Sequence, residues 1–150
     1  MYLDTCCYNR PFDKQASLRI ALETQAKLYI QQLIRYSELE LATSYMLLYE
    51  VGQNPFIIRQ FLIEDFLNQY SSIHIGPEYA SKIQCEAQSV ISTGIKPKDA
   101  YHVMCAIEAD CRFFLSTDDR LLKFQTNKLQ LMNPVDFVLK EVGDYEPHHE

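Results

Sequence analysis

Four acidic residues lie where the sequence pattern predicts that helices and strands begin or end. Asp4 follows the apolar residues Met-Tyr-Leu, and Glu50 ends the apolar stretch YMLLYE. Asp99 lies near the start of the segment KPKDAYHVMCAI, and Asp118 follows the run FFLST. Carboxylate oxygens are ligands that suit hard divalent cations such as Mg²⁺ and Mn²⁺. If these four carboxylates meet in space, they can form a metal site.

Each of these acids also has a purely structural explanation. Asp99 in a first helical turn is favoured by the helix dipole, and Asp118 is a good N-cap for a following helix. Glu50 can lie on the exposed side of an amphipathic helix. Asp4 can cap a turn, although an unpaired charge among apolar residues is costly. Taken singly, none of the acids establishes a site.

The composition indicates one globular domain. The chain has 150 residues, of which 47% are hydrophobic and 12% aromatic, and its net charge of −6 argues against a broadly basic nucleic-acid-binding surface. An acidic site loaded with divalent cations can still receive phosphates. The five cysteines form no C-x-x-C pair, and we interpret Cys6 and Cys7 as buried thiols in a reducing compartment. With no apolar run near the ~20 residues that span a bilayer, and a strand expected from the first residue, we expect a cytoplasmic protein without a signal peptide.

Short apolar runs alternate with helical periodicity along the whole chain. This alternation is typical of an α/β fold, here a doubly wound parallel sheet of about five strands flanked by helices. We expect a single domain at 1–142, followed by a polar C-terminal tail at 143–150. The expected strands are 1–4, 39–42, 72–75, 112–115 and 129–132.

The first connection is expected to contain a loop and then a long helix. The turn formers in YNRPF predict the loop, and Asp13 is a candidate N-cap for a helix over 13–35. Apolar residues recur along this helix at spacings of three and four, with Arg19, Glu23 and Lys27 expected on other faces. The apolar residues are Leu18, Leu22, Ala26, Tyr29 and Leu33.

In a parallel sheet the carboxyl ends of the strands share one edge, which is where such sheets bind ligands. Asp4 and Asp118 each follow a strand, so we expect them to meet at that edge. The order strand–Asp, helix–Glu, helix-start–Asp, strand–Ser-x-Asp resembles the PIN-domain family of nucleases. The matching stretches are YLDTCCY, SYMLLYEV, KPKDAYHVMCAI and FFLSTDDRLL, and the ending LQLMNPVDFV is also similar.

The resemblance implies a divalent-metal site with Mg²⁺ or Mn²⁺ as cofactor. It implies that Asp4, Asp99 and Asp118 are metal ligands, and that Glu50 binds through water or orients the attacking water. The implied reaction is hydrolysis of RNA phosphodiester bonds. The similarity to VapC-type toxins further implies an antitoxin partner and a homodimer.

Several neighbouring residues are candidates for supporting roles. The family's hydroxyl-x-Asp pattern fits Ser116-Thr117-Asp118, but it also fits one residue later, where Asp119 would be the site acid. We prefer Asp118, with Asp119 beside the site or solvated. Ser116 and Thr117 can bind a carboxylate or phosphate or act as caps. Other residues that could contact substrate or surround the site are Asn9, Tyr8, His102, Lys96, Lys98, Arg120 and Lys123.

Two other functions compete with a ribonuclease. One is a catalytically weak PIN-like module that binds RNA or protein, which would be expected to have lost an acidic position. The other is a phosphatase with an aspartyl nucleophile at Asp4, but the stretch DTCCY has no second acid two residues further on. The four acids of this chain favour the nuclease.

Overall fold

The structure, a computed structural model, describes residues 1–143, so most of the predicted polar tail lies outside the described residues. Its centre is a parallel sheet in the order β3-β2-β1-β4-β5. The strands are β1 Tyr2–Leu3, β2 Leu41–Ser44, β3 Ser71–Ile75, β4 Phe113–Leu115 and β5 Gln130–Met132. The predicted α/β class, parallel sheet and number of strands are confirmed.

The strand order reverses at β1, which lies between β2 and β4. Tyr2 is paired with Ala42 on one side and with Phe114 on the other, and the backbone N–H of Asp4 donates to the carbonyl of Leu115 at 2.9 Å. The chain leaves β1 toward β2 and β3 and later returns to β4 and β5. Such a reversal leaves a crevice outside the carboxyl ends of the strands.

The first connection begins with a helix where the sequence predicted a loop. Helix α1 spans Thr5–Asn9 and is followed by the 3-10 helix η1, Arg10–Phe12. The prediction was wrong because Asp4 caps this short helix: its Oδ1 accepts from the backbone N–H of Thr5 at 2.8 Å. Asp4 thus ends the strand and begins the helix.

Helix α2 spans Leu18–Arg35, and its N-cap is Ser17 instead of the predicted Asp13. Asp13 closes η1 and forms an ion pair of 2.9 Å with Arg10. The Ser17 hydroxyl accepts from the backbone N–H of Ile20 at 3.5 Å, so the helix begins about one turn later than predicted.

The predicted apolar face of α2 is partly wrong. Leu18 and Leu22 are 75% and 48% exposed, whereas Glu23 and Lys27 are 1% and 6% exposed. Glu23 is buried because Arg10 and Arg19 pair with it at 2.9 and 3.2 Å. Buried charges require such partners, and these come from residues that the periodicity of one helix cannot identify.

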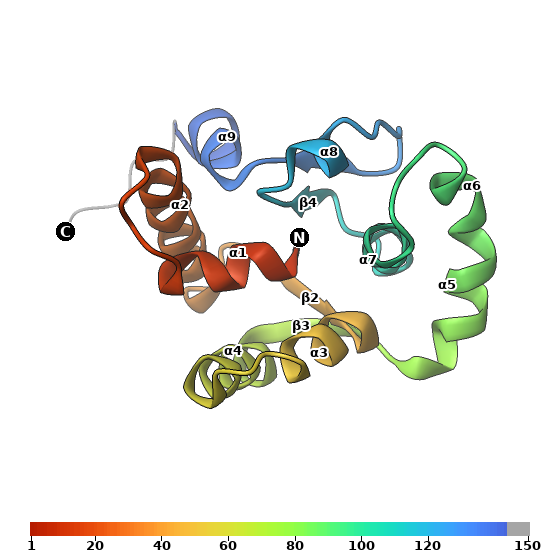
Figure 1. The fold of residues 1–150 in the computed structure, drawn as a ribbon, viewed down its shortest axis with the longest axis horizontal. Helices are drawn as coiled ribbons and strands as arrows, with labels where there is room; N and C mark the ends of the chain where they lie inside the picture. Colours follow the sequence, from red (N-terminus) through yellow and green to blue (C-terminus); the bar gives the residue numbers. More distant parts are fainter. Residues whose placement is uncertain (144–150) are drawn as a thin grey trace.

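The remaining helices complete the layers that cover the sheet. In Figure 1, α2 and α9 lie side by side, and α5 packs against α7 at the opposite end of the molecule. Gly94 has a φ of 101° at the turn before α7, a conformation that favours glycine. The helices are α3 Tyr45–Gly52, α4 Ile57–Tyr70, η2 Pro77–Tyr79, α5 Ala80–Glu86, α6 Gln88–Ile91, α7 Pro97–Glu108, α8 Asp119–Leu122, α9 Pro134–Phe137 and the π-turn Val138–Val142.

The central strands are buried on both faces. Tyr2 and Leu3 of β1 and Phe114 and Leu115 of β4 are inaccessible to solvent. Helices therefore cover both sides of the sheet, as parallel sheets require, and the carboxyl edge is where polar groups are gathered. Among residues 1–143, no helix combines the length and apolar character needed to cross a membrane.

Candidate metal centre

Asp4 lies at the carboxyl end of β1 and is 7% exposed. Besides the Thr5 N–H on Oδ1, its Oδ2 accepts a hydrogen bond from the Ser116 hydroxyl at 2.9 Å. The thiol of Cys6 lies 3.5 Å from the same oxygen. Ser116 directly follows β4, so this contact joins the ends of two adjacent strands. The convergence expected from the parallel sheet is present between these two segments.

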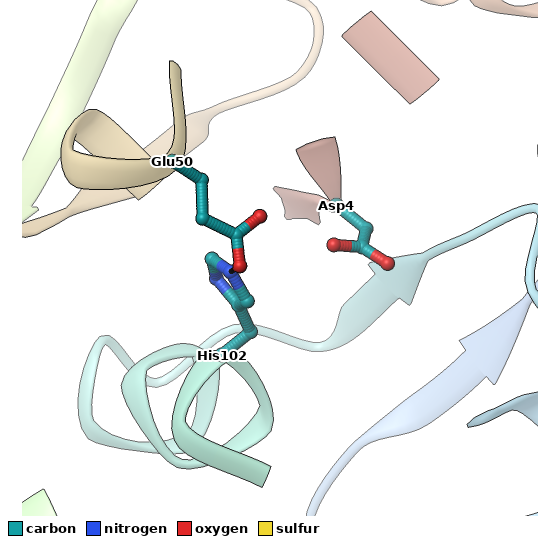
Figure 2. A group of neighbouring side chains, drawn as sticks. All are labelled: Asp4, Glu50 and His102. Atoms are coloured by element: carbon teal, nitrogen blue, oxygen red, sulfur yellow. Dashed lines mark ion pairs between the residues drawn. The ribbon is translucent and has the colours of Figure 1, made fainter. Parts of the chain in front are cut away.

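Glu50 reaches the same edge from the last turn of α3. Its Oε2 accepts from the Thr5 hydroxyl at 2.6 Å, and its Oε1 lies 2.9 Å from Nε2 of His102. Figure 2 shows the carboxylates of Glu50 and Asp4 pointing toward one another, with the His102 ring against Glu50. Burial would raise the pKa of Glu50, but His102 and the Thr5 hydroxyl outweigh it and hold that pKa below its usual value.

His102 lies on α7 and is fully buried. Its Nδ1 is 2.6 Å from the hydroxyl of Tyr2, which is 2.7 Å from Oγ of Ser44. Ser44 in turn caps α3 by accepting from the backbone N–H of Leu47. Nε2 is close to Glu50, but the contact lacks the alignment of a hydrogen bond. One ligand atom from each of Asp4, Glu50 and His102 lies within 4.8 Å of the others.

Asp99 stands in the first turn of α7, three residues before His102. Its carboxylate accepts no hydrogen bond from any residue in the described part of the chain. Burial, together with the negative charges of Asp4 and Asp118, raises the pKa of Asp99 from 3.8 to about 6. A half-buried carboxylate without donors and beside other acids favours a cation, which would hold it in its charged form.

The two adjacent aspartates face different surroundings. Asp118 caps α8: its Oδ1 accepts from the backbone N–H groups of Arg120 and Leu121 at 2.9 and 3.5 Å. Asp119 is held by both terminal nitrogens of Arg19, at 2.8 and 2.9 Å. The hydrogen bonds from Arg19 hold the pKa of Asp119 below its usual value. Asp119 is thus paired with a cation, whereas Asp118 acts as a helix cap and keeps Oδ2 without a hydrogen bond among the described residues.

The hydroxyl residues before Asp118 hold the end of β4 in place. The Ser116 hydroxyl accepts from the backbone N–H of Asp118 at 3.1 Å while it donates to Asp4. The backbone N–H of Thr117 contacts Sγ of Cys6 at 3.3 Å, and its carbonyl accepts from Arg19 at 3.0 Å. Ser116 therefore contacts a carboxylate, one of the two roles considered from sequence.

A cavity of about 590 Å³ opens beside the acids. Asp99 and Asp118 line it together with the cationic residues Lys96, Arg120 and Lys123. These cations offer a surface for phosphate groups next to the carboxylates. Asn9 has a structural contact instead: its Oδ1 accepts from Asn54 at 3.2 Å, which ties α1 to the loop before α4.

The donor set fits a divalent cation. Carboxylate oxygens from Asp4 and Glu50 and the buried nitrogen of His102 lie within reach of one another, and Asp99 carries unbalanced charge beside them. Oxygen and imidazole donors are ligands for Mg²⁺, Mn²⁺ and related ions. Asp4, Glu50 and His102 could hold such an ion, and among residues 1–143 Asp99 and Asp118 are not part of this close group.

Sequence reasoning missed several residues that position the acids. Thr5 was overlooked as a donor to Glu50, although it directly follows Asp4. Tyr2 and Ser44 were counted as a strand residue and a helix cap. Nothing in their local sequence indicates that Tyr2 contacts His102 and that Ser44 contacts the Tyr2 hydroxyl. Cys6 was interpreted as a buried thiol, yet it lies against Asp4 and is partly exposed.

No protein-family model matches the chain, and no curated protein sequence matches it. Among solved structures, the crystal structure of FitAcB from Neisseria gonorrhoeae is similar in fold. The two share 16% sequence identity with a TM-score of 0.54, over 89% of this chain and 96% of that chain. This similarity and the sheet described above define a PIN-like α/β fold. At this level of identity the similarity concerns the fold alone.

Proposed function

We propose that this protein is a metal-dependent ribonuclease that hydrolyses RNA phosphodiester bonds and acts as the toxin of a toxin–antitoxin pair. The observation that carries the proposal is the gathering of acids from four separate segments at one edge of the sheet. Asp4 and Glu50 lie near His102, Asp99 lies close enough to Asp4 and Asp118 for their charges to raise its pKa, and Asp99 and Asp118 line the cavity. The PIN-like fold and the sequence resemblance to VapC-type toxins support the same function.

The residues of the site would have three roles in hydrolysis: binding the metal, orienting the attacking water and holding the RNA. Asp4, Asp99 and Asp118 would hold Mg²⁺ or Mn²⁺, which would supply positive charge to the phosphate and lower the pKa of bound water. Glu50, whose Oε2 accepts from the Thr5 hydroxyl and whose Oε1 lies beside His102, would orient the water that attacks phosphorus. The cations along the cavity hold the RNA backbone without reading its bases, so they position the strand.

A protein partner is supported by the surface of α4. This helix exposes the large apolar residues Phe56, Ile57, Ile58, Phe61 and Leu62. A contiguous apolar patch on a helix is a common mark of a protein interface. We assign this surface to contact with another protein, with an antitoxin and a second copy of the chain as the partners that the resemblance implies. Co-expression with a neighbouring short reading frame, followed by mass measurement, distinguishes the two.

An RNA cleavage assay tests the proposal. The purified protein is incubated with single-stranded RNA in Mg²⁺ or Mn²⁺, then in excess EDTA, and then with the metal restored. We expect cleavage that EDTA abolishes and added metal recovers. The Asp4→Asn variant, purified in the same way, controls for contaminating nuclease and should be inactive.

The alternative of a catalytically weak binding module gives a different result in the same assay. A module of that kind would bind RNA or a partner protein with no metal-dependent cleavage by the wild type. Undiminished cleavage in EDTA, with contamination excluded by the variant, would contradict the metal mechanism.

A further inference from the structure

One donor near the acids is not a carboxylate. We infer that Nε2 of His102 is a direct ligand of the divalent cation, and that this nitrogen makes the site prefer Mn²⁺ over Mg²⁺. The inference rests on the proposed function, because it concerns the metal of the same site. It adds a ligand and a selectivity that the four acids alone do not supply.

The burial of His102 is the first observation. The side chain is inaccessible to solvent, and Nε2 makes no aligned hydrogen bond within the described part of the chain. A buried polar atom without a satisfied hydrogen bond is uncommon and costs free energy, so it requires an explanation. Here Nε2 points into a group of carboxylates, where a cation would satisfy it.

The spacing of the donors is the second observation. Nε2 of His102 is 2.9 Å from Oε1 of Glu50. Two ligands bound at about 2.1 Å to one octahedral cation lie about 3.0 Å apart when they are adjacent. The pair is therefore already spaced like two neighbouring ligands, with Asp4 within 4.8 Å of both.

The contact made by the other ring nitrogen, Nδ1, favours metal binding at Nε2. A metal-bound imidazole usually donates its second N–H to an oxygen, which fixes the tautomer and the ring orientation. Nδ1 of His102 meets the Tyr2 hydroxyl at 2.6 Å, and that hydroxyl meets Oγ of Ser44 at 2.7 Å. Hydroxyl groups both donate and accept. Nδ1–H can thus donate to the Tyr2 hydroxyl, and the Tyr2 hydroxyl can donate to Ser44. This arrangement leaves the lone pair of Nε2 free for the cation.

The nitrogen ligand has a consequence for metal choice. Mg²⁺ prefers oxygen ligands and keeps several waters, whereas the first-row transition metals, of which Mn²⁺ is the weakest binder, also accept imidazole. A site in which His102 joins the carboxylates is accordingly biased toward Mn²⁺ relative to Mg²⁺.

The test uses the spin-echo modulation of bound Mn²⁺, which detects a coordinated imidazole nitrogen. The chain has four histidines, so His74, His148 and His149 are first replaced by Gln to leave His102 alone. In this background we expect one bound Mn²⁺ with ¹⁴N modulation of the imidazole type. The modulation should disappear in a protein that also carries His102→Gln, which shows that the signal comes from this ring.

Metal affinity gives a second measurement. We expect His102→Gln to weaken Mn²⁺ binding by about tenfold or more and Mg²⁺ binding by less than about threefold, as for loss of a nitrogen donor. Tyr2→Phe should weaken Mn²⁺ binding in the same direction, because it removes the partner of Nδ1. Equal losses for both metals would overturn the inference.

The outcomes separate this inference from the proposed function. If Mn²⁺ binds and RNA is cleaved but no imidazole modulation is seen, His102 is not a ligand while the ribonuclease proposal stands. If neither metal binds to the wild type, both fail. The modulation measured before His102 is changed does not depend on the folding of any His102 variant.

Discussion

Replacing Asp99 with Asn should stabilise the metal-free protein while it destroys cleavage. In the folded protein the pKa of Asp99 is raised to about 6 by burial and by the charges of Asp4 and Asp118. Its ionised form is therefore unfavourable without metal. Asn keeps nearly the same shape without the charge, so it removes this repulsion.

The size of the effect follows from the raised pKa. A rise from 3.8 to about 6 corresponds to about 3 kcal/mol against the ionised form. Because Asp99 is only half buried, screening by solvent reduces this to about 1–2 kcal/mol, and loss of a first-turn charge removes about 0.3–1 kcal/mol more. We expect a net gain of about 1 kcal/mol for the variant, or about 2–4 °C in melting temperature.

The gain depends on pH with a definite sign. The folded protein holds the Asp99 proton more tightly than the unfolded chain, so stability is lost as pH rises from 3.8 through about 6. The advantage of Asp99→Asn should be complete above pH 7. At pH 4.5 it should fall to about a third, because there the folded wild type keeps the proton.

Divalent metal should make the wild type more stable than Asp99→Asn, the reverse of their order in EDTA. Unfolding by urea is measured in EDTA and again with Mn²⁺ in excess. A cation that binds only the folded wild type raises its stability in proportion to the logarithm of metal concentration. Asp99→Asn should gain less, so the wild type becomes the more stable of the two, and RNA cleavage by the variant should fall by several orders of magnitude.

Asp136→Asn is a matched control. Like Asp99, Asp136 lies in the first turn of a helix, but it is exposed, and it is absent from the lining of the cavity that Asp99 and Asp118 share. It should lose a little stability in EDTA and leave cleavage unchanged. A variant Asp99→Asn that is less stable than wild type in EDTA, or that cleaves RNA normally, would refute the reasoning.

Three further substitutions test other parts of the account. Thr5→Val removes the hydroxyl that donates to Glu50, and single-turnover cleavage should fall by about 10–100-fold without loss of folding; an unchanged rate would contradict this. Lys96→Gln and Lys123→Gln together should make RNA binding less sensitive to salt. The plot of log binding constant against log salt concentration, measured in the Asp99→Asn background, should become shallower by about 0.7 for each lysine removed. An unaltered slope would exclude phosphate contacts at these lysines. Gly94→Ala should cost about 1 kcal/mol in urea unfolding, because φ is 101° at this residue, and a neutral result would contradict that strain.

The sheet was predictable because each strand is a short apolar run between turn formers. The edge at which Asp4 and the end of β4 lie together followed from a rule about parallel strands, so segments far apart in sequence could be brought together without coordinates. The wrong predictions lie in the first connection. There the partners of Glu23 and the cap at Asp4 decide the structure, and periodicity within one helix contains neither.

The candidate acids could be named from the sequence, but the residues that hydrogen-bond to Glu50 and His102 could not. Tyr2 and His102 are 100 residues apart, and Thr5 and Glu50 are 45 apart. A tyrosine in a buried strand and a threonine after an aspartate are ordinary residues in sequence. Their hydroxyl groups acquire a role only when the strand order brings the helices α1, α3 and α7 to the same edge.

Sulfur substitution at the cleaved phosphate tests the central claim most directly. An RNA that the protein cleaves is resynthesised with sulfur in place of one non-bridging oxygen at that position. Mg²⁺ binds sulfur poorly and Mn²⁺ binds it better, so direct contact between the phosphate and a metal predicts slow cleavage in Mg²⁺ that Mn²⁺ restores. The account predicts this rescue for the wild type and none for Asp4→Asn. Equal cleavage of both RNAs in Mg²⁺, for either sulfur isomer, would contradict a metal held by these acids at the scissile phosphate.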